Sequence, residues 1–564
     1  MIKPRKALEN VIPYQLPLIS RKNKIRLDLN ESPFWCSPKV MEAIKSVGPE
    51  DISTYPEYQT LMEKIANYFE IKSENVLLTN GADDAIRCII ETYVEEKGEV
   101  MIPEPSYSMF EIFCKIRGAK ILKVPCDKNL SFPTEKVLSQ INERTKMIIL
   151  SNPGNPTGTS IKEGDLIEIL KKGKIVLLDE TYWHFAKKSN IRLTEDFDNL
   201  FVTQSFSKIF GLAGLRLGFL ISDEENIKNI TKVALPFAVN SLAVRAGSAA
   251  LDDKKFVERV VKETEKEKRF LCRELEKFGN VLKVHKTDTN FLLVDFGEFG
   301  NEMHKKLADK NVLVRRMDSY SVLNGFLRIT VGKREDNLAL LEAIEGAIPL
   351  KAILFDMDGV LVDVSSSYRL AIKETANHFL KEDVSPDEIE ELKRKGYNND
   401  WDLTEAIIRS HGLKVPRGEI IKKFQELYLG KNFDGFIKNE RLLISSGILK
   451  KLKKDYRLAI VTGRPKTEAE HALNVFEIRE YFDVVIAMED VTGGKKEGID
   501  LVLKKFKEKR GLYLGDNVDD VKAAISSGMI PVGVSSSDAT KEILKKAGAK
   551  YVIRDVKEIV KILG

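Results

Sequence analysis

The amino-acid sequence predicts an α/β protein with two domains, and three observations carry this prediction. Short apolar runs typical of β-strands alternate with charged, helix-period stretches along the whole chain. These runs fall into two series, one before and one after about residue 349. The length of 564 residues suits two to four domains at roughly 100–200 residues each. A single small binding module is therefore excluded.

The first series of strands lies in the N-terminal half of the chain. Each run is too short, and too rich in β-branched or apolar residues, to be a helix. The runs are NVLLT (75–79), MIILS (147–151), KIVLLD (174–179), LFVTQ (200–204) and LGFLI (217–221).

The second series follows a predicted helix over residues 334–347. Ile348-Pro349 closes this helix, because proline stops a helix and restarts the chain in an extended form. We therefore expect one domain over 1–349 and another over 350–564. The second series comprises KAILFD (351–356), RLAIVT (457–462), DVVIA (483–487), GLYLG (511–515) and IPVGV (530–534).

Composition excludes several classes of partner. The chain is 43% hydrophobic and 31% charged, which fits a globular protein and neither a disordered chain nor a coiled-coil rod. Lys and Arg number 90 against 85 Asp and Glu, and this surplus of +5 is too dilute to predict binding to nucleic acid or to a membrane. We expect small-molecule substrates, and anionic ones suit this balance.

The cysteines and the N-terminus predict a cytoplasmic protein. The five cysteines are odd in number and widely spaced, which fits neither a disulfide framework nor a zinc site. No stretch reaches the ~18 apolar residues of a membrane-spanning helix, and the N-terminus lacks the apolar segment of a signal peptide.

Lys208 is the centre of the chemistry predicted for the first domain. It lies in TQSFSKIFGLAGLRLGF, after a strand and among small hydroxyl residues, with Arg216 further along. This arrangement suits an amine that forms a Schiff base beside a phosphate. The backbone N–H groups of Ala82 and Asp83, at the start of a predicted helix, offer a phosphate cradle. Asp179 ends a strand at the edge where α/β sheets bind ligands.

The order of these motifs resembles that of the fold-type I pyridoxal-phosphate-dependent aminotransferases, and the likeness is greatest to the histidinol-phosphate aminotransferase family. The resemblance covers about residues 8–347 and implies a large mixed sheet plus a small domain. The motifs that carry it are NVIPYQ (10–15), LNESP (29–33), TYPE (54–57), GADDAI (81–86), PSYSMF (105–110), SNPGNPTG (151–158), LLDETY (177–182), SFSK (205–208), GLAGLRLGF (211–219) and GFLRITVGKRED (325–336).

The resemblance implies pyridoxal 5′-phosphate as cofactor. Lys208 would form the Schiff base and move the catalytic proton. Asp179 would keep the pyridine nitrogen protonated, so that the ring accepts electrons. Tyr182 and Asn155 would hydrogen-bond the ring O3′, and Tyr107 would stack on the ring face.

The resemblance also implies a phosphate site and a homodimer. Tyr55 corresponds to a family residue that reaches a phosphate across the dimer interface, which implies composite active sites. The residues that would hold the cofactor phosphate within one chain are Ala82, Asp83, Ser205, Ser207 and Arg216.

Substrate selection is assigned to two arginines near predicted strand ends. Arg328 is the first candidate to bind the anionic group of the substrate, with Arg315 on the phosphate side and Tyr14 at the imidazole end. Arg315 has a surface ion pair as its alternative, because Arg316 beside it offers the same charge.

Two carboxylates mark the start of the second domain. In ILFDMDGVLVD, Asp356 and Asp358 follow a strand and precede a glycine. Carboxylates this close repel one another unless a cation or different roles separate them. Further polar motifs follow at VTGRP (461–465), GGKKEG (493–498) and YLGDNVDD (513–520).

These motifs resemble the haloacid-dehalogenase superfamily over about residues 351–564. The resemblance implies a Rossmann-like phosphatase in which Asp356 forms an aspartyl-phosphate, while Asp358 protonates the leaving alcohol and then activates water. Mg²⁺ would be held by Asp356, Asp516 and the backbone carbonyl of Asp358, with Asp520 in support.

The remaining superfamily roles fall to a hydroxyl, a lysine and a cap. Thr462 would hold a phosphoryl oxygen. Lys495 would neutralise charge on the transferring group, with Lys496 as its alternative. Residues 366–435, in which charged and apolar residues alternate with helical period, would form a helical cap over the site.

Three functions remain open from the sequence. The first is a bifunctional histidine-biosynthesis enzyme. It interconverts histidinol phosphate plus 2-oxoglutarate with imidazole-acetol phosphate plus glutamate, and it also hydrolyses histidinol phosphate. The second replaces that phosphatase by a housekeeping enzyme of phosphoglycolate-phosphatase type. The third is a phosphothreonine decarboxylase with a non-catalytic or regulatory C-terminal module.

Overall fold

A computed structural model describes residues 2–9, 11–14, 20–127, 129–278, 282–348, 350–394, 399–506, 508 and 510–563. The chain divides into two compact units. One contains Met1–Glu276 and Leu282–Ile348, and the other contains Lys277–Val281 and Pro349–Gly564. Pro349, where the sequence predicts the domain boundary, lies outside the described residues.

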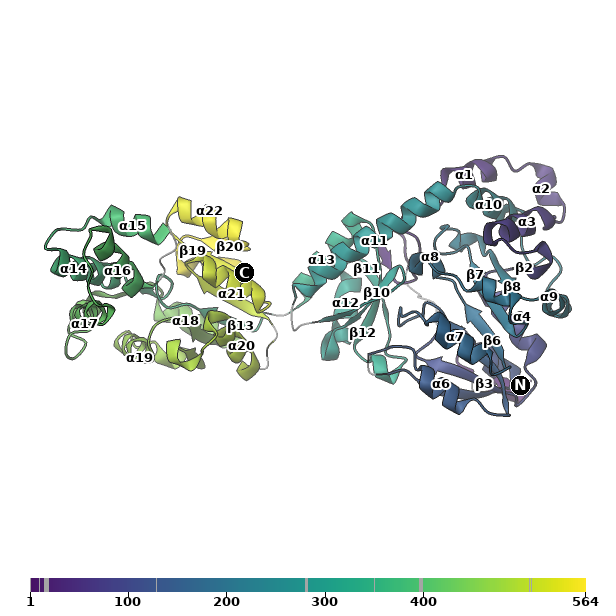
Figure 1. Ribbon diagram of the computed structural model, residues 1–564, viewed down its shortest axis with the longest axis horizontal. Coiled ribbons are helices and arrows are strands. Elements are labelled where there is room, and N and C mark those ends of the chain that lie inside the picture. Colours follow the sequence, from purple (N-terminus) through teal and green to yellow (C-terminus); the bar gives the residue numbers. More distant parts are fainter. Residues whose placement is uncertain are drawn as a thin grey trace. The chain divides into compact units, whose positions relative to one another are not determined.

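A seven-stranded mixed sheet forms the centre of the first unit (Figure 1). In sheet order the strands are β2 (Val76–Thr79), β8 (Gly218–Ile221), β7 (Leu200–Ser205), β6 (Ile175–Asp179), β5 (Thr145–Ser151), β3 (Glu99–Glu104) and β4 (Lys120–Pro125). β8 is antiparallel to both of its neighbours, and the other pairs are parallel. All five strands predicted here are confirmed; β3 and β4 are additional.

Helices cover both faces of this sheet. Along β5, Ile148 and Leu150 pack into one core, and Met147 and Ile149 pack into another. Side chains alternate between the faces of a strand, so a strand buried on both faces reads as a continuous apolar run. The helices on the first face include α3 (Gln59–Phe69), α7 (Glu163–Leu170) and α10 (Ser241–Leu251), and those on the second are α4 (Ala82–Tyr93), α5 (Ser108–Arg117) and α9 (Glu224–Thr231).

A smaller five-stranded sheet completes the first unit. Its order is β1 (Ile25–Leu27), β11 (Val312–Arg316), β12 (Phe326–Thr330), β10 (Phe291–Asp295) and β9 (Lys283–His285). β12 is antiparallel to β10 and β11, and their register places Arg315 opposite Arg328. The remaining helices are α1 (Pro38–Lys45), α2 (Pro49–Ser53), α6 (Thr134–Gln140), α8 (Trp183–Ala186), α11 (Lys254–Glu276), α12 (Gly300–Asp309) and α13 (Arg334–Ala347). α13 coincides with the predicted helix.

The second unit is built on a six-stranded parallel sheet. Its order is β17 (Val484–Ile486), β16 (Arg457–Val461), β13 (Ala352–Phe355), β18 (Gly511–Gly515), β19 (Ile530–Val534) and β20 (Tyr551–Ile553). The five predicted strands of this series are confirmed. The helices of this part are α18 (Ser446–Asp455), α19 (Lys466–Val475), α20 (Gly494–Phe506), α21 (Val518–Ser526), α22 (Asp538–Ala547) and α23 (Ile559–Leu563).

Four helices form a separate layer within the second unit (Figure 1). They are α14 (Tyr368–Leu380), α15 (Pro386–Arg394), α16 (Asp400–Ser410) and α17 (Arg417–Tyr428), and they enclose an apolar core of their own. The chain enters this layer after β14 (Val362–Asp363) and returns at β15 (Arg441–Leu442), which pairs with β14 in antiparallel. We call α14–α17 the cap.

No helix in the described parts of the chain is long and apolar enough to cross a membrane.

Candidate active sites

The first candidate site lies at the carboxyl ends of β5, β6 and β7, which are neighbouring parallel strands. Asp179 is the last residue of β6, and Lys208 lies in the turn after β7. Asn155 lies in the loop after β5. Parallel strands bring residues from distant stretches of sequence to one edge of a sheet, where α/β proteins bind ligands.

Lys208 carries the amine around which this site is arranged. Its Nζ donates a hydrogen bond to the carbonyl oxygen of Leu29 at 2.9 Å and lies 6.0 Å from the centroid of the Tyr182 ring. Burial lowers the pKa of this amine from 10.5 to about 8, and the positive charge of Arg328 acts in the same direction. Part of the Lys208 population is therefore neutral near pH 7, as a nucleophilic amine must be.

Asp179 supplies a buried carboxylate. Burial raises its pKa to about 6. Thr181 donates to Oδ1 from its hydroxyl at 2.7 Å and its backbone N–H at 3.2 Å, and the Thr203 hydroxyl donates to the same oxygen at 3.4 Å. Among the described residues Oδ2 has no hydrogen-bond donor. A buried carboxylate that has one oxygen without a hydrogen-bond donor suits a cationic ring nitrogen as its partner.

The start of α4 and the segment between β7 and β8 lie side by side, and we call the site that they form the cradle. Gly81 precedes α4 with a φ of +80°, and a Cβ there would lie 2.5 Å from Nη2 of Arg216. A side chain at position 81 would be strained at this φ and would push the Arg216 guanidinium away from the helix N-terminus, which itself attracts anions. Ser205 Oγ accepts a hydrogen bond from the Ser207 N–H at 3.0 Å, whereas Ser207 Oγ is buried without a partner.

Asp83 ties a tyrosine to this cradle. Its Oδ2 accepts a hydrogen bond from Arg216 Nη2 at 2.9 Å, and its Oδ1 accepts one from the Tyr107 hydroxyl at 2.9 Å. Burial and the Asp83 charge raise the pKa of Tyr107, so the phenol stays neutral. Ala82 and Asp83 are the first two residues of α4.

Arg328 crosses from the small sheet to the loops of the large one. Its Nη1 donates to Asn155 Oδ1 at 2.7 Å and its Nη2 donates to the Asp28 carbonyl at 2.8 Å. Its Nε is buried without a partner. Burial and the like charge of Arg315 lower the pKa of Arg328. Among the described residues Arg328 has no carboxylate partner that would stabilise its charge.

Arg315 lies beside Arg328 without an ion pair among the described residues. Its guanidinium carbon lies 5.3 Å from the centroid of the Tyr14 ring. Arg316 instead forms an ion pair with Asp318. The surface ion pair considered as an alternative for Arg315 is thus found at Arg316, and two guanidinium groups remain to receive an anionic ligand.

Tyr55 stands apart from the other predicted residues. Its ring stacks on Phe237 with centroids 4.0 Å apart, and 75% of the residue is exposed. Within the described parts of the chain, the stacking on Phe237 is not a contact with any residue of the cradle.

Sequence reasoning missed the role of Asn30. This buried residue has a φ of +55°, and its Nδ2 donates to the Tyr182 hydroxyl at 2.8 Å. The backbone N–H of Asn30 donates to Thr330 Oγ1 at 3.0 Å, which fixes the loop in place. The LNESP motif contains Asn30 and was the available signal, although its spacing alone gives no partner.

These residues fit pyridoxal 5′-phosphate. The partnerless Ser207 Oγ, the Arg216 guanidinium and the start of α4 suit its phosphate, and the free Oδ2 of Asp179 suits its ring nitrogen. Lys208 supplies an amine for its aldehyde.

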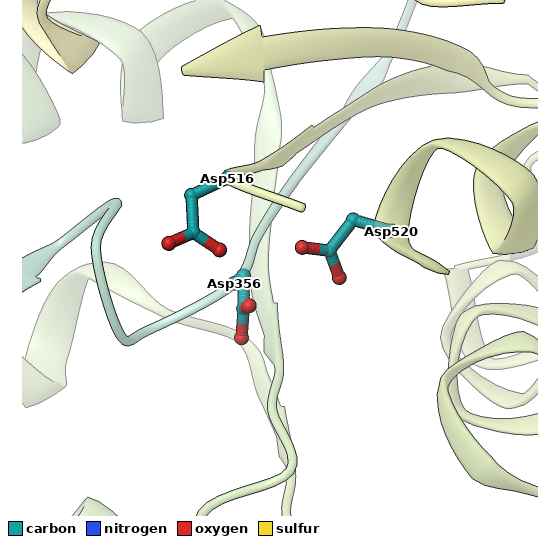
Figure 2. A group of neighbouring side chains, drawn as sticks. All are labelled: Asp356, Asp516 and Asp520. Atoms are coloured by element: carbon teal, nitrogen blue, oxygen red, sulfur yellow. The ribbon is translucent and has the colours of Figure 1, made fainter. Parts of the chain in front are cut away.

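The second candidate site is a cluster of aspartates at the carboxyl edge of the parallel sheet in the second unit. Asp356 follows β13, Asp516 follows β18, and Asp520 lies in the first turn of α21. Figure 2 shows the three side chains close together, with Asp516 and Asp520 on either side of Asp356, and one oxygen from each lies within 4.8 Å of the others. Burial raises the pKa of all three carboxyl groups, that of Asp516 to about 6.

Lys495 partly compensates the charge of this cluster. Its Nζ lies 2.5 Å from Asp356 Oδ2 and 2.5 Å from Asp520 Oδ1, and the two carboxylates raise its pKa. Lys496 is exposed and pairs with Asp500 at 2.6 Å. The structure therefore brings Lys495, and not Lys496, to the aspartates.

Two glycines allow the aspartates to approach the backbone. A Cβ on Gly359 would lie 2.2 Å from Asp516 Oδ2, and a Cβ on Gly515 would lie 2.2 Å from Asp520 Cβ. Gly359 also has a φ of +73°, which favours glycine. Side chains at either position would displace the carboxylates.

The cluster fits a small divalent cation. All three groups offer hard carboxylate oxygens, which Mg²⁺ prefers, and their mutual repulsion raises the benefit of a bound cation. Asp358, placed in the predicted ligand set through its backbone carbonyl, directs its side chain elsewhere, because Oδ1 accepts hydrogen bonds from Arg464. Thr462 is buried, and its Oγ1 accepts a hydrogen bond from the Arg464 N–H at 3.2 Å.

Sequence reasoning also missed Arg464. Its side chain is fully buried and pairs with both Asp358 and Glu440. The signal was present in VTGRP, but that motif was interpreted only through Thr462.

Comparisons with known proteins match both parts of the chain. The family described as aminotransferase class I and II matches residues 22–344, and the family described as haloacid dehalogenase-like hydrolase matches residues 353–534.

Similar whole proteins are found for the first part. The histidinol-phosphate aminotransferase of Clostridium novyi (strain NT) is 34% identical over 347 residues, covering 61% of this chain and 96% of that protein. The histidinol-phosphate aminotransferase 2 of Archaeoglobus fulgidus is 36% identical over 332 residues, covering 57% and 93%. The crystal structure of the histidinol-phosphate aminotransferase from Clostridium acetobutylicum has a TM-score of 0.54 at 26% identity, covering 57% of this chain and 98% of that one.

Proposed function

Because the chain belongs to the class I and II aminotransferase family and also carries a haloacid dehalogenase-like hydrolase domain, we propose that it is a bifunctional enzyme of histidine biosynthesis. The first unit would transfer an amino group between histidinol phosphate with 2-oxoglutarate and imidazole-acetol phosphate with glutamate. The second unit would hydrolyse a phosphate monoester with Mg²⁺. The aminotransferase part of this proposal rests on the Lys208 amine, which has a pKa lowered to about 8 and belongs to the same site as the cradle and the buried carboxylate of Asp179.

Pyridoxal 5′-phosphate supplies, when bound, an aldehyde that attaches to an amine and a ring that accepts electrons. Lys208 would hold the cofactor through Nζ and, after the substrate amine takes its place, would move a proton to and from the substrate α-carbon. Asp179 would keep the ring nitrogen protonated. Tyr182 and Asn155 would orient the ring oxygen, and Tyr107 would cover the ring face.

The cofactor phosphate would lie in the cradle at the start of α4. The helix N-terminus and the Arg216 fork both favour a dianion, and Ser207 Oγ has a donor to offer. The residues we assign to this contact are Ala82, Asp83, Ser205, Ser207 and Arg216.

Arg328 and Arg315 would select the substrate. A phosphate monoester of charge near −2 suits two guanidinium groups without counter-ions better than a single carboxylate does. Arg328 would contact the anionic group first, with Arg315 on the phosphate side and Tyr14 at the imidazole end. The names of the two curated relatives above favour histidinol phosphate as that substrate.

We further assign a homodimer. Tyr55 would complete the phosphate site of a second copy, and its exposure in one chain supports this role. Three exposed apolar residues, Ile52 near it in sequence, Phe237 stacked on its ring and Leu235 close to Phe237 in sequence, offer a contact surface for that copy.

In the second unit Asp356 would attack phosphorus through a carboxylate oxygen. The bond from phosphorus to the substrate oxygen breaks, and that oxygen takes a proton from Asp358, which gives the alcohol and an aspartyl-phosphate. Water then attacks phosphorus, gives its proton to Asp358, and releases inorganic phosphate and the Asp356 carboxylate.

The other residues of this site would manage the charge of the phosphoryl group. Asp356, Asp516 and the Asp358 carbonyl would hold Mg²⁺, with Asp520 in support. Thr462 would bind a phosphoryl oxygen. Lys495 Nζ would neutralise the negative charge that moves during transfer.

Histidinol phosphate is the substrate we assign to this phosphatase. It is a phosphate monoester and the product of the first unit, so a fused pair of consecutive activities would use it directly. The test compares kcat/KM for histidinol phosphate with that for phosphoglycolate and several sugar phosphates, with Asp356→Asn as the blank. A preference of more than about tenfold for another ester, or ~1.4 kcal/mol of transition-state binding, would reject this substrate and favour a housekeeping phosphatase.

The test of the first unit is product analysis. Purified protein with imidazole-acetol phosphate and glutamate should yield histidinol phosphate and 2-oxoglutarate, and Lys208→Ala should yield neither. Carbon dioxide release from phosphothreonine, without amino-group transfer, would favour the decarboxylase instead.

A further inference from the structure

Arg464 occupies an unusual place beside the second site. Its side chain has 0% exposure, although it lies in the loop after β16 only two residues beyond Thr462. Its Nε and Nη2 donate to the same carboxylate oxygen, Oδ1 of Asp358, at 2.9 and 2.5 Å. A guanidinium buried so completely is costly unless its charge is paired and its N–H groups are satisfied.

The other side of the guanidinium is satisfied by the end of the cap. Nη1 and Nη2 of Arg464 donate to the two carboxylate oxygens of Glu440 at 3.0 and 3.2 Å. Glu440 is itself buried and directly precedes β15, where the chain leaves the cap. Arg464 thus bridges a fixed carboxylate at the cap boundary and the more exposed carboxylate of Asp358.

Further hydrogen bonds hold Glu440 in place. Ser367 Oγ, at the entry to the cap, donates to Glu440 Oε1 at 3.0 Å, and the Tyr428 hydroxyl at the end of α17 donates to the same oxygen at 3.1 Å. Tyr368 lies against Arg464, with 5.4 Å from the guanidinium carbon to the ring centroid. Contacts with the cap and with Glu440 therefore hold the Arg464 guanidinium in place independently of its hydrogen bonds to Asp358.

The geometry at Asp358 separates the functions of its two oxygens. Both Arg464 donors converge on Oδ1, and among the described residues Oδ2 receives no hydrogen bond. Two donors from one rigid planar group fix the rotation of the carboxylate as well as its position. Oδ2 is then the oxygen presented for exchange of a proton with a substrate or water.

We propose that Arg464 is the positioning residue of the phosphatase reaction, which aims Oδ2 of Asp358 at the leaving oxygen. This inference rests on the proposed phosphatase activity. Arg464 does not touch the substrate in this view and acts only through Asp358. A purely structural role, in which Arg464 stabilises the cap boundary, is the competing explanation.

The leaving group distinguishes these two roles. When phosphorus is transferred to Asp356, an alkoxide leaving oxygen needs the proton of Asp358, whereas the p-nitrophenolate leaving group departs without one. The value of kcat/KM reports the steps up to this first transfer. Misaligned proton donation therefore lowers kcat/KM for alkyl esters selectively, and general disorder of the site lowers it for both kinds of ester.

The experiment measures kcat/KM with Mg²⁺ for p-nitrophenyl phosphate and for the faster of histidinol phosphate and phosphoglycolate. For Arg464→Gln we expect a loss of about 10²–10³-fold with the alkyl ester, within the range that general acid catalysis supplies. The loss with p-nitrophenyl phosphate should stay below about tenfold, because that leaving group bypasses the proton donor. Arg464→Lys, which keeps the charge and loses the fork, should lie between wild type and Arg464→Gln.

Two further variants keep the test decisive. Glu440→Gln leaves Arg464 in place and removes the charge that fixes it, so it should show the same selective loss on a smaller scale, even where Arg464→Gln folds poorly. Arg479→Gln is the matched control: it breaks an arginine pair with Glu470 in the same unit and should leave the ratio of the two esters unchanged.

Equal losses on both esters in Arg464→Gln and Glu440→Gln would overturn the positioning role and leave the phosphatase standing. Absence of Mg²⁺-dependent hydrolysis of every ester by the wild-type protein would instead reject the proposed phosphatase, and the positioning role with it.

Discussion

Lys208 and Lys495 are the same residue type at the same kind of place, yet their surroundings prepare them for opposite tasks. Each lies near the carboxyl edge of a sheet with parallel strands. Lys208 has a carbonyl oxygen as hydrogen-bond partner and an arginine as electrostatic neighbour, and burial lowers its pKa to about 8. Lys495 lies between two aspartates, which raise its pKa.

The contrast shows that the neighbours of a lysine decide between nucleophile and fixed charge. Removing a lysine from water favours the neutral amine, unless carboxylates within hydrogen-bond distance reverse the effect. Both lysines lose water here, but only Lys495 gains carboxylates. Lys208 is thereby suited to form and release a covalent bond, and Lys495 to remain charged throughout a reaction.

The largest loss of activity among the variants that test the contrast between Lys208 and Lys495 is expected for Lys208→Ala. Lys208→Ala removes the amine that we assign to both cofactor attachment and proton transfer, so transamination should fall by at least about 10⁴-fold, the upper end for general acid–base catalysis. The wild-type protein should be yellow and should retain cofactor covalently after borohydride reduction. Lys232→Ala, at an exposed lysine of the same unit, serves as control. Reduced cofactor attached to another lysine would refute the assignment.

The second largest effect is expected on metal removal, which should abolish the activity of one site and leave that of the other. Chelation by EDTA should abolish phosphate-monoester hydrolysis, because the buried aspartates then repel the incoming phosphate, and added Mg²⁺ should restore it. Transamination by the same sample should be unchanged, since none of the residues assigned to it lies in the aspartate cluster. Hydrolysis that persists after exhaustive chelation would contradict the Mg²⁺ site.

A smaller loss is expected when the charge of Lys495 is removed. Lys495→Met should lower kcat for ester hydrolysis by about 10²–10³-fold, the typical cost of one fixed electrostatic donor. Lys496→Met should change kcat less than about twofold, because its Nζ pairs with Asp500 away from the cluster. The reverse order of these two variants would show that the wrong lysine has been assigned.

The smallest effect concerns pH. Attachment of pyridoxal 5′-phosphate to the apo-protein needs neutral Lys208, so its rate should rise about tenfold per pH unit below the pKa of the amine. With that pKa lowered to about 8, the rate should level off above pH 8. Absorbance of the attached cofactor in stopped flow measures this rate. A rise that continues toward pH 10 would mean that Lys208 behaves as an ordinary surface lysine.

The sequence predicted most of the strands that are buried on both faces, the edge strand β2 among them, although it missed β3 in the interior of the large sheet. NVLLT, KIVLLD and GLYLG are continuous apolar runs, because both sides of these strands pack against helices. β4 (Lys120–Pro125) has lysines within it and its strand ends in proline, so its apolar signal is interrupted. The family likeness predicted the aminotransferase and haloacid dehalogenase-like parts, and both are confirmed by the family matches.

The sequence predicted the site residues that belong to a recognisable motif. It did not predict those whose role depends on a contact with a residue far away in the sequence. Asn30 contacts Tyr182 from 152 residues away, and Arg464 contacts Asp358 from 106 residues away. The spacing within LNESP or VTGRP carries no information about such partners. The choice between Lys495 and Lys496 depends on where α20 begins, because successive side chains on a helix point about 100° apart.

Because β14 pairs with β15, the segment between them, which contains the cap, is an insertion that can be replaced as a unit. Its two ends leave the parallel-sheet domain on adjacent strands, which lie about 4.8 Å apart. Recombination could therefore replace or excise the segment between them by joining neighbouring strands with a turn, and the sheet that holds the aspartates would need no rebuilding. Such an exchange must preserve the ion pair with Arg464, since a new segment without a carboxylate at the place of Glu440 would leave Arg464 paired with Asp358 alone. This requirement limits which inserted segments the scaffold can accept.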